Sequence, residues 1–222
     1  MTRRIFRDRQ DAGVRLATEL AAYANDPTVL VLGLPRGGVP VAYEVARALR
    51  APLDVFVVRK LGVPGHRELA MGAIATGGVR VLNDDVIESL QISVPIIDAV
   101  ARYEGAELER QQRAYRDDVP VPNVTGRTVI IVDDGLATGS TMRAAVRALR
   151  QSAPARIVAA VPVGAAETCR SLRDEADDVV CATIPRDFQA VSLWYGEFSQ
   201  ITDQEVRSFL EAAAAAHGAP AR

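Results

Sequence analysis

Short apolar runs alternate along the chain with longer amphipathic segments. The apolar runs are rich in β-branched residues, which is the pattern of strands buried on both faces. These predicted strands span residues 29–33, 53–58, 128–132, 156–161 and 179–182. Apolar positions at helical spacing predict helices over residues 9–25, 41–50, 141–150 and 166–174. Strands alternating with helices predict an α/β fold, a doubly wound, mainly parallel five-stranded sheet with helices on both faces.

The stretch between the second and third predicted strands departs from this alternation. Residues 59–69 are polar and contain glycine and proline, so they predict a flexible loop. Alternating apolar positions over residues 71–83 predict a hairpin that turns at Gly77 and Gly78. A long helix should follow and end near Arg116. We therefore expect a flexible hairpin loop beside the sheet.

The C-terminal part is expected to cover one end of the sheet. Residues 184–202 are irregular in pattern and predict a small hood. The hood contains the aromatic residues Phe188, Trp194, Tyr195 and Phe198. A terminal helix should begin after Thr202, because Thr202 and Glu205 have the spacing of a capping box. We expect a single domain over residues 1–222, with a core at about 27–183 and the hood and terminal helices around it.

Composition narrows the functional classes. Hydrophobic residues make up 49% of the 222 residues and charged residues 24%, as in a globular protein. The net charge of −2 offers no basic face, so we expect no nucleic-acid partner. The sequence contains no signal-peptide pattern and no apolar run of membrane length, so we expect a cytoplasmic protein without a membrane partner. Cys169 and Cys181 have no neighbours at metal-ligand spacing, and we expect buried free thiols.

The run from Val129 to Thr141 carries the strongest chemical signal. An apolar strand ends in Asp133 and Asp134, and a loop of small and hydroxylated residues then leads into a helix. Such a loop presents backbone N–H groups and a positive helix end to a phosphate. The two carboxylates suit the hydroxyls of a sugar, or a metal beside one. The run therefore predicts a site for a sugar phosphate or a nucleotide.

This run resembles the 5-phosphoribosyl 1-diphosphate (PRPP) signature of type I phosphoribosyltransferases. The resemblance implies that Asp133 and Asp134 face the ribose hydroxyls and hold Mg²⁺ indirectly. It also implies a 5-phosphate loop made of Ala137, Thr138, Gly139, Ser140 and Thr141. Gly135 departs from the family pattern, which more often has an apolar residue at this position.

A second motif follows the first predicted strand. Pro35, Arg36, Gly37 and Gly38 resemble the family's pyrophosphate-binding loop, in which glycines let backbone N–H groups approach an anion closely. The resemblance implies a cis peptide bond between Pro35 and Arg36. An ordinary strand-to-helix turn with a surface arginine is the alternative interpretation.

Basic residues after the second predicted strand extend the resemblance. Of the 26 basic residues, 25 are arginine, and Lys60 is the single lysine. The resemblance implies that Lys60, through its compact ammonium charge, and Arg36, through its guanidinium, stabilise the leaving pyrophosphate. Arg59 and Arg67 would add contacts from the mobile loop.

The resemblance implies a Mg²⁺-dependent phosphoribosyltransferase, which moves the phosphoribosyl group of PRPP to a nitrogenous, nucleobase-like acceptor and releases pyrophosphate. Phe188 and Trp194 would stack on the acceptor, or the aromatic residues would only pack the hood. The family also implies a homodimer. Two alternatives stay open: a PRPP- or nucleotide-binding regulatory protein without catalysis, and a sugar-phosphate hydrolase-like enzyme, for which no general base is identifiable.

Overall fold

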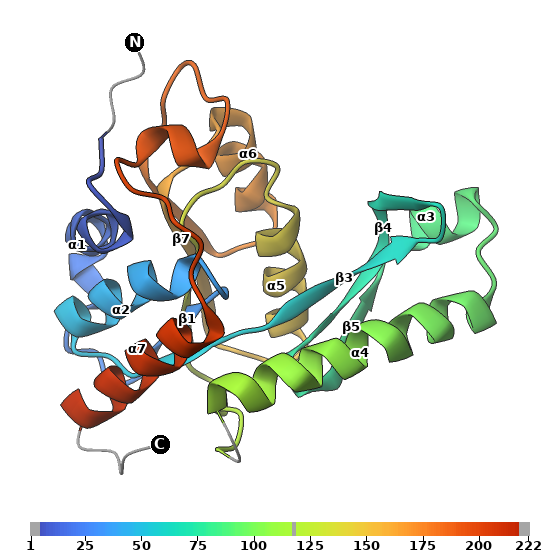
Figure 1. Cartoon of the computed structure of the whole chain (residues 1–222), viewed down its shortest axis with the longest axis horizontal. Helices are drawn as coiled ribbons and strands as arrows, with labels where there is room; N and C mark the ends of the chain where they lie inside the picture. The colour runs from blue at the N-terminus through green and yellow to red at the C-terminus, as the bar shows by residue number, and fades with distance from the viewer. Residues whose placement is uncertain (1–4, 117–118, 218–222) are drawn as a thin grey trace.

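The computed structural model describes residues 5–116 and 119–217, apart from the side chains of residues 67 and 68. It consists of a layered core from which a long arm projects to one side (Figure 1). The core holds the two ends of the described chain and the hood. The arm is formed by the segment that follows the second strand of the core.

The core is built on the predicted parallel sheet. Its strands are β1 (Val29–Gly33), β2 (Leu53–Val55), β6 (Thr128–Val132), β7 (Arg156–Val163) and β8 (Asp178–Thr183). Their order is β2-β1-β6-β7-β8, and every neighbouring pair is parallel. All five residues of β1 are buried, because helices cover both faces of the sheet. The prediction of a doubly wound five-stranded sheet is therefore confirmed.

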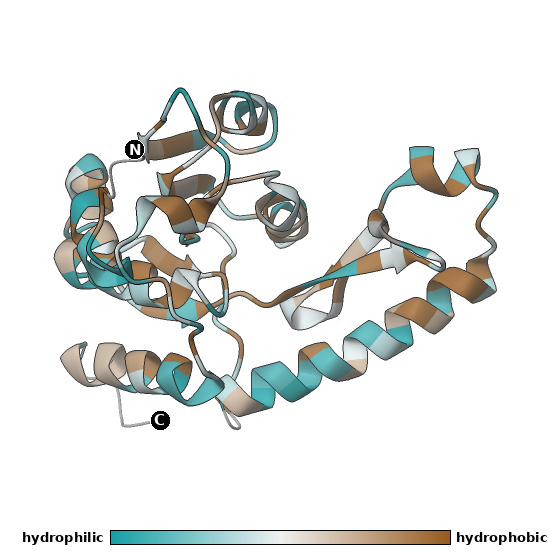
Figure 2. Ribbon diagram, turned by 45° about the horizontal axis from the view of Figure 1, so that its top comes forward, coloured by the Kyte–Doolittle hydropathy of each residue, from teal (hydrophilic) through white to brown (hydrophobic). Residues whose placement is uncertain are grey.

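Helices cover the two faces of the sheet in separate groups. One face packs against α1 (Arg9–Glu19), α2 (Gly38–Leu49) and α7 (Asp203–Ala216). The other face packs against α5 (Ser140–Arg150) and α6 (Ala166–Ser171). Alternate residues of each strand enter the two clusters, as the period of two requires. In Figure 2 the hydrophobic colour accordingly gathers on the strands of this sheet.

The arm consists of a small antiparallel sheet and two helices. Its strands β3 (Val58–Val63), β4 (His66–Ala75) and β5 (Val79–Leu82) lie in that order. The helices α3 (Asp84–Ser89) and α4 (Val94–Arg116) follow, and α4 runs along the sheet back to the core (Figure 1). Pairing of β4 with β5 confirms the predicted hairpin, whose turn contains Gly77 and Gly78 at positive φ.

The predicted flexible loop over residues 59–69 is wrong. These residues form most of a second hairpin, in which β3 pairs with β4. Leu61 and Val63 are buried against Met71 of β4 and Ile97 of α4. The mostly polar sequence of β3 does not identify it as a strand. Its few apolar residues are buried by α4, which lies far along the chain, and the local sequence pattern carries no information on such packing.

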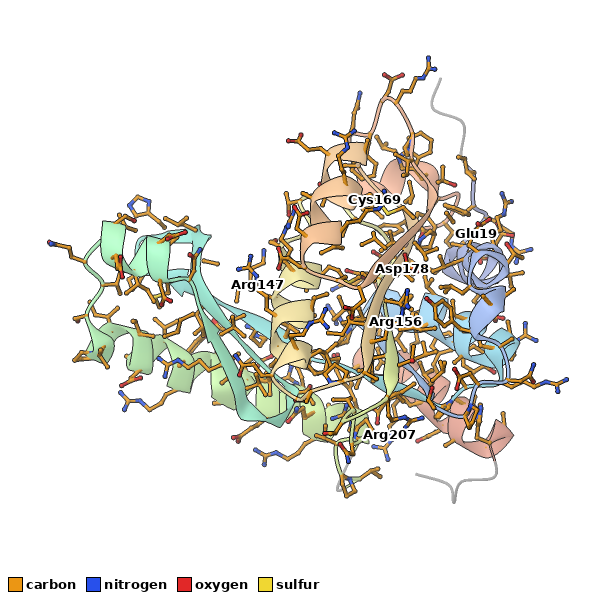
Figure 3. The ribbon with its side chains drawn as sticks, turned by 180° about the vertical axis from the view of Figure 1, so that it is seen from behind. Glu19, Arg147, Arg156, Cys169, Asp178 and Arg207 are labelled. Carbon is orange, nitrogen blue, oxygen red and sulfur yellow. A yellow bond between two sulfur atoms is a disulfide. The ribbon has the colours of Figure 1, made fainter. Side chains whose placement is uncertain are left out.

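The predicted free thiols are also wrong. Cys169 of α6 and Cys181 of β8 form a disulfide, although 12 positions separate them. The pairing arises because α6, on which Figure 3 labels Cys169, packs against β8, and both sulfur atoms lie beside Gly164, the residue that follows β7. No helix within the described ranges has both the length and the apolar character needed to cross a membrane.

Candidate active site

Two loops meet where strands β1 and β6 end. Gly33 and Val132 are partners in the register of the two strands, so the loops that follow begin side by side. The Leu34 N–H donates to the Val132 carbonyl over 2.8 Å. In parallel sheets the carboxyl ends of neighbouring strands are the usual place for a ligand. The predicted pyrophosphate loop and the predicted acidic pair are thus brought to one place.

Glycines allow these loops to approach each other closely. A Cβ atom at Gly37 would collide with Oδ2 of Asp134, and one at Gly38 would lie 2.6 Å from the Val132 carbonyl oxygen. No side chain fits at either position without displacing the acidic loop. The peptide bond between Pro35 and Arg36 is cis, as the resemblance implies.

The two carboxylates occupy a half-buried and charged environment. Burial raises the pKa of the Asp133 carboxyl well above its usual value, and the neighbouring charge of Asp134 raises it further. The Asp133 carboxylate accepts the Asp134 N–H over 2.9 Å. Burial also raises the pKa of Asp134, while a nearby guanidinium lowers it. Perturbed acids at the end of a parallel strand are typical of a functional site.

That guanidinium belongs to Arg9, which the sequence analysis did not identify. Arg9 Nε donates to Asp134 Oδ2 over 2.9 Å, across 125 positions of the chain. The Tyr195 hydroxyl donates to the Asp134 carbonyl over 2.5 Å. A signal for Arg9 did exist, because it shares the buried face of α1 with Ala12 and Leu16 at helical spacing. A charged residue within an apolar stripe indicates a buried partner.

The predicted 5-phosphate loop leads directly into α5. Gly139 has a φ of 73° and precedes Ser140, the first residue of the helix. Thr168 of α6 supports the loop, since its hydroxyl donates to the Ala137 carbonyl over 2.7 Å. The first turn of α5 presents backbone N–H groups, which together with the helix dipole favour a phosphate. Thr138 is exposed and lies 3.2 Å from Ser140, hydroxyl to hydroxyl.

Residues 65–196 match the phosphoribosyl transferase domain family. This segment covers more than half of the chain and includes the acidic pair, the predicted 5-phosphate loop and most of the hood. The chain belongs to the phosphoribosyl transferase domain family.

Individual relatives agree with the family match. A protein of Mycobacterium tuberculosis strain H37Rv, provisionally named a phosphoribosyl transferase, is 48% identical over 213 residues. The match covers 95% of this chain and 47% of that protein, so the chain spans about half the length of this relative. The bifunctional protein PyrR of Chloroflexus aurantiacus is 41% identical over 130 residues, which cover 57% of this chain and 65% of PyrR.

A solved structure shows the same fold. The crystal structure of TT1426 from Thermus thermophilus is similar to this chain with a TM-score of 0.84 and 41% sequence identity. The similarity covers 92% of this chain and 97% of TT1426. The arm and the core therefore both belong to an arrangement that TT1426 shares.

The basic residues predicted for the pyrophosphate and the loop contacts come from two parts of the structure, with Arg36 after β1 and the neighbouring residues Arg59 and Lys60 on β3. Arg36 reaches toward α7, where its Nη1 lies 3.8 Å from Asp203 Oδ1. Arg59 forms an ion pair with Glu104 of α4 over 2.6 Å, which holds it on the arm. Lys60 lines a cavity of about 250 Å³ between the arm and α5, together with Ser140. The side chain of Arg67 lies outside the described part of the structure.

The cavity beside Lys60 is strongly basic. Arg143 and Arg147 of α5 line it as well, and both guanidinium groups also bind Glu175. Figure 3 shows Arg147 on the side of α5 that faces the arm. Since Ser140 belongs to the predicted 5-phosphate loop, this cavity adjoins the candidate active site.

The hood aromatic residues are mainly packing residues. Trp194 is only 7% exposed and lies in a cluster with Phe6 and Tyr195. Phe188 is partly buried against the same cluster. A Cβ atom at Gly135 would lie 2.5 Å from Val191 of the hood, which explains why this chain departs from the apolar residue of the family. Of the two interpretations, this packing favours a structural role for Trp194.

Proposed function

We propose that this chain binds PRPP and transfers its phosphoribosyl group to a nitrogenous acceptor. One observation carries the proposal: the glycines of the pyrophosphate loop pack directly against Asp133 and Asp134. This packing supports a single site that would take a diphosphate, a ribose and, at the start of α5, a 5-phosphate. The family match supports a transferase of this class.

In the proposed reaction, a nitrogen of the acceptor forms a bond to C1 of the ribose. The bond from C1 to the pyrophosphate oxygen breaks, and its electron pair leaves with pyrophosphate. The acceptor nitrogen loses its proton to solvent. The protein needs no nucleophile, because positioning and charge stabilisation lower the barrier of a transition state that resembles an oxocarbenium ion.

In this reaction each group of residues of the chain would bind a different part of PRPP. Asp133 and Asp134 hold the ribose hydroxyls, and the turn from Ala137 to Thr141 holds the 5-phosphate. Backbone N–H groups of Gly37 and Gly38 face the diphosphate. Arg36, in the same loop, would bind the diphosphate in place of Asp203, whose Oδ1 lies 3.8 Å from its Nη1.

Mg²⁺ fits this site only as an ion shared with the substrate. Within the described residues no group of three or more histidine, cysteine or acidic side chains could hold a metal. Asp133 and Asp134 are two carboxylates, and Mg²⁺ commonly binds through one or two carboxylates plus substrate phosphates. When bound in this way it would neutralise charge on the diphosphate.

A regulatory protein that binds PRPP without catalysis is the second candidate. It is favoured by the positions of the basic side chains, since Arg36 and Arg59 both contact carboxylates of the protein.

We also propose that the chain forms a homodimer through the arm. Leu90, Val94 and Tyr103 are large side chains exposed on α4 and at the end of α3. Sedimentation equilibrium tests this proposal.

Titration calorimetry with PRPP, with and without Mg²⁺, tests the proposed function first. We expect micromolar binding that Mg²⁺ strengthens and that the double substitution Asp133→Ala/Asp134→Ala abolishes. A panel of nitrogenous acceptors then separates the two candidates. Release of pyrophosphate with one acceptor supports the transferase, and binding without release across the panel supports the regulator. A folded wild-type protein that does not bind PRPP would contradict both.

A further inference from the structure

We propose that Arg9 is a positioning residue of the PRPP site. This inference rests on the proposed function and adds to it a residue of the N-terminal helix. Arg9 lies outside residues 65–196, the segment that matches the family. The proposed role is to hold the carboxylate of Asp134 in place and to tie it to the hood.

Three contacts define the position of the Arg9 guanidinium. Nε donates to Asp134 Oδ2 over 2.9 Å, and Nη1 donates to the Ser199 carbonyl over 2.8 Å. The guanidinium carbon lies 3.8 Å from the centre of the Phe198 ring, within the range of a cation–π interaction. Arg9 is only 8% exposed. A planar group with two donors and a stacked face is thus held in one orientation.

The scaffold beneath Arg9 is rigid. The Asp8 side chain caps α1 by accepting the Asp11 N–H over 2.8 Å, which sets the first turn and directs Arg9 inward. A Cβ atom at Gly13 would lie 2.7 Å from the Val41 carbonyl oxygen, so α1 packs tightly on α2. Leu16 is fully buried on the same face. A side chain mounted on such a helix can position another group precisely.

The contact with Arg9 determines where the Asp134 carboxylate can lie. Two adjacent, half-buried carboxylates repel each other, and the guanidinium offsets this repulsion. The Oδ2 atom that Arg9 binds also occupies the space left by the missing side chain of Gly37. We assign Oδ1 of Asp134 to a ribose hydroxyl, because Arg9 binds the other oxygen.

The same guanidinium joins the acidic pair to the hood. Tyr195 donates to the Asp134 carbonyl, and its ring centre lies 4.9 Å from that of Phe198. Arg9 stacks on Phe198 and binds the next residue, Ser199. Three segments that are distant in sequence therefore meet at Arg9. Loss of Arg9 should loosen the ribose contacts without touching the atoms that react.

Calorimetry with matched variants tests this role. Wild-type protein, Arg9→Met, Arg9→Lys and the control Arg15→Met are titrated in Mg²⁺ with PRPP, ribose 5-phosphate and inorganic pyrophosphate. Arg15 is a suitable control, because it also lies on α1 with its guanidinium carbon 5.4 Å from an aromatic ring, that of Phe6, and pairs with Asp11. Its ion pair is thus with a residue of its own helix and not with the acidic pair.

We expect Arg9→Met to weaken the binding of PRPP and of ribose 5-phosphate about 10- to 100-fold, as the loss of a charged hydrogen bond predicts. The stoichiometry should stay unchanged, and pyrophosphate should bind as it does to the wild type. Arg9→Lys keeps the charge without the two-donor geometry, so its affinity for PRPP and ribose 5-phosphate should lie between those of the wild type and Arg9→Met. Arg15→Met should match the wild type. Fluorescence of Trp194, the single tryptophan, verifies that the hood remains folded.

Several outcomes would overturn the role of Arg9. Wild-type affinity of Arg9→Met for PRPP would do so, as would a reduced stoichiometry with an unchanged Kd, which indicates a purely structural role. Equal weakening of pyrophosphate binding would indicate collapse of the whole site. If Arg9→Met does not fold, wild-type PRPP affinity of Arg9→Lys overturns the assignment. Failure of the wild type itself to bind PRPP would overturn the proposed function as well.

Discussion

At the scale of single residues, the candidate site depends on glycines, which have no side chain, as much as on its acidic residues. Gly37 and Gly38 leave room for the acidic loop, and Gly135 leaves room for Val191 of the hood. Asp133 and Asp134 are half-buried, and the partial loss of solvent raises the pKa of both carboxyls. Functional sites often keep such unfavourable groups at a cost in stability.

Substituting Gly37 tests the close approach of the two loops. Gly37→Ala places a Cβ atom against the Asp134 carboxylate, so we expect PRPP binding to weaken at least about tenfold as the acidic loop shifts. Gly105→Ala is the matched control, since its Cβ atom would lie at an ordinary contact distance of 3.6 Å from Ile74. The control should bind normally and gain about 0.5–1 kcal/mol of stability in urea unfolding.

Neutralising Asp133 should stabilise the protein while it impairs binding. The pKa of Asp133 is raised in the folded state, so ionisation costs stability as pH rises from about 3.9, its unfolded value, through the folded pKa. Asp133→Asn removes this cost and keeps an acceptor for the Asp134 N–H. We expect a higher Tm at pH 8 than the wild type and a smaller difference at pH 5, with PRPP binding lost.

The control for this prediction is Asp187→Asn. Asp187 is an exposed residue of the hood, so its substitution should leave Tm nearly unchanged at both pH values. A Tm of Asp133→Asn below that of the wild type at pH 8 would mean that the Asp133 charge is stabilised by its surroundings.

At the scale of secondary-structure elements, local signals predicted well and long-range packing did not. The predicted capping box of α7 is present, because Thr202 and Glu205 each bond the other's backbone N–H. Such a motif spans four residues and is complete in the sequence. The β3 strand was missed, because Leu61 and Val63 are buried only once α4 packs over them. A polar strand of an antiparallel sheet is difficult to identify from its own sequence, because its burial depends on elements that lie elsewhere in the chain.

Removing the cap of α7 should weaken the core. Thr202→Ala removes the hydroxyl that accepts the Glu205 N–H over 3.2 Å, and we expect a loss of about 0.5–2 kcal/mol in urea unfolding. Ser208→Ala within the same helix is the control and should be neutral or slightly stabilising, since alanine favours a helix interior. Equal stability of the two variants would show that the cap contributes nothing measurable.

The position of Lys60 on β3 gives a kinetic prediction. Lys60 and Ser140 line the same cavity between the arm and α5, so the Lys60 ammonium group lies beside the proposed PRPP site. Under the proposed function, Lys60→Ala should lower the rate of pyrophosphate release about 100-fold, and PRPP affinity should fall less. Rapid-quench kinetics measures the first effect and calorimetry the second. Equal losses would assign Lys60 to ground-state binding.

At the scale of the whole molecule, the arm is fixed to the core where α4 ends. Arg116 at the end of α4 binds Asp54 of β2 over 2.8 Å, and the two side chains are 2% and 5% exposed. Tyr115 donates to Asp203 of α7 over 3.1 Å, and Asp203 also lies near Arg36. The base of the arm is therefore connected to the proposed pyrophosphate loop through one carboxylate.

The disulfide between α6 and β8 is a whole-chain property that can be tested directly. Unfolded protein should react with no alkylating reagent before reduction and should gain two alkyl groups after it, by mass spectrometry. Reduction should lower the unfolding free energy by about 3 kcal/mol, because the bond restricts the unfolded chain between two cysteines that are 12 positions apart. In Cys181→Ser, Cys169 should react without reduction. Two reactive thiols in the untreated wild type would contradict the pairing.

The sequence by itself determined which strands and helices build the core, the order in which they alternate, and the two loops that carry the proposed chemistry. It extended two elements too far, since β2 ends at Val55 and α1 ends at Glu19. These features depend on neighbouring residues, namely β-branched runs, helical spacing, a capping pair and glycines beside acids. Only the tertiary structure decided that Arg9 binds Asp134, that residues 59–69 are mostly strand and that the cysteines pair. Each of these depends on contacts between distant segments, and such contacts exist only after the elements have packed.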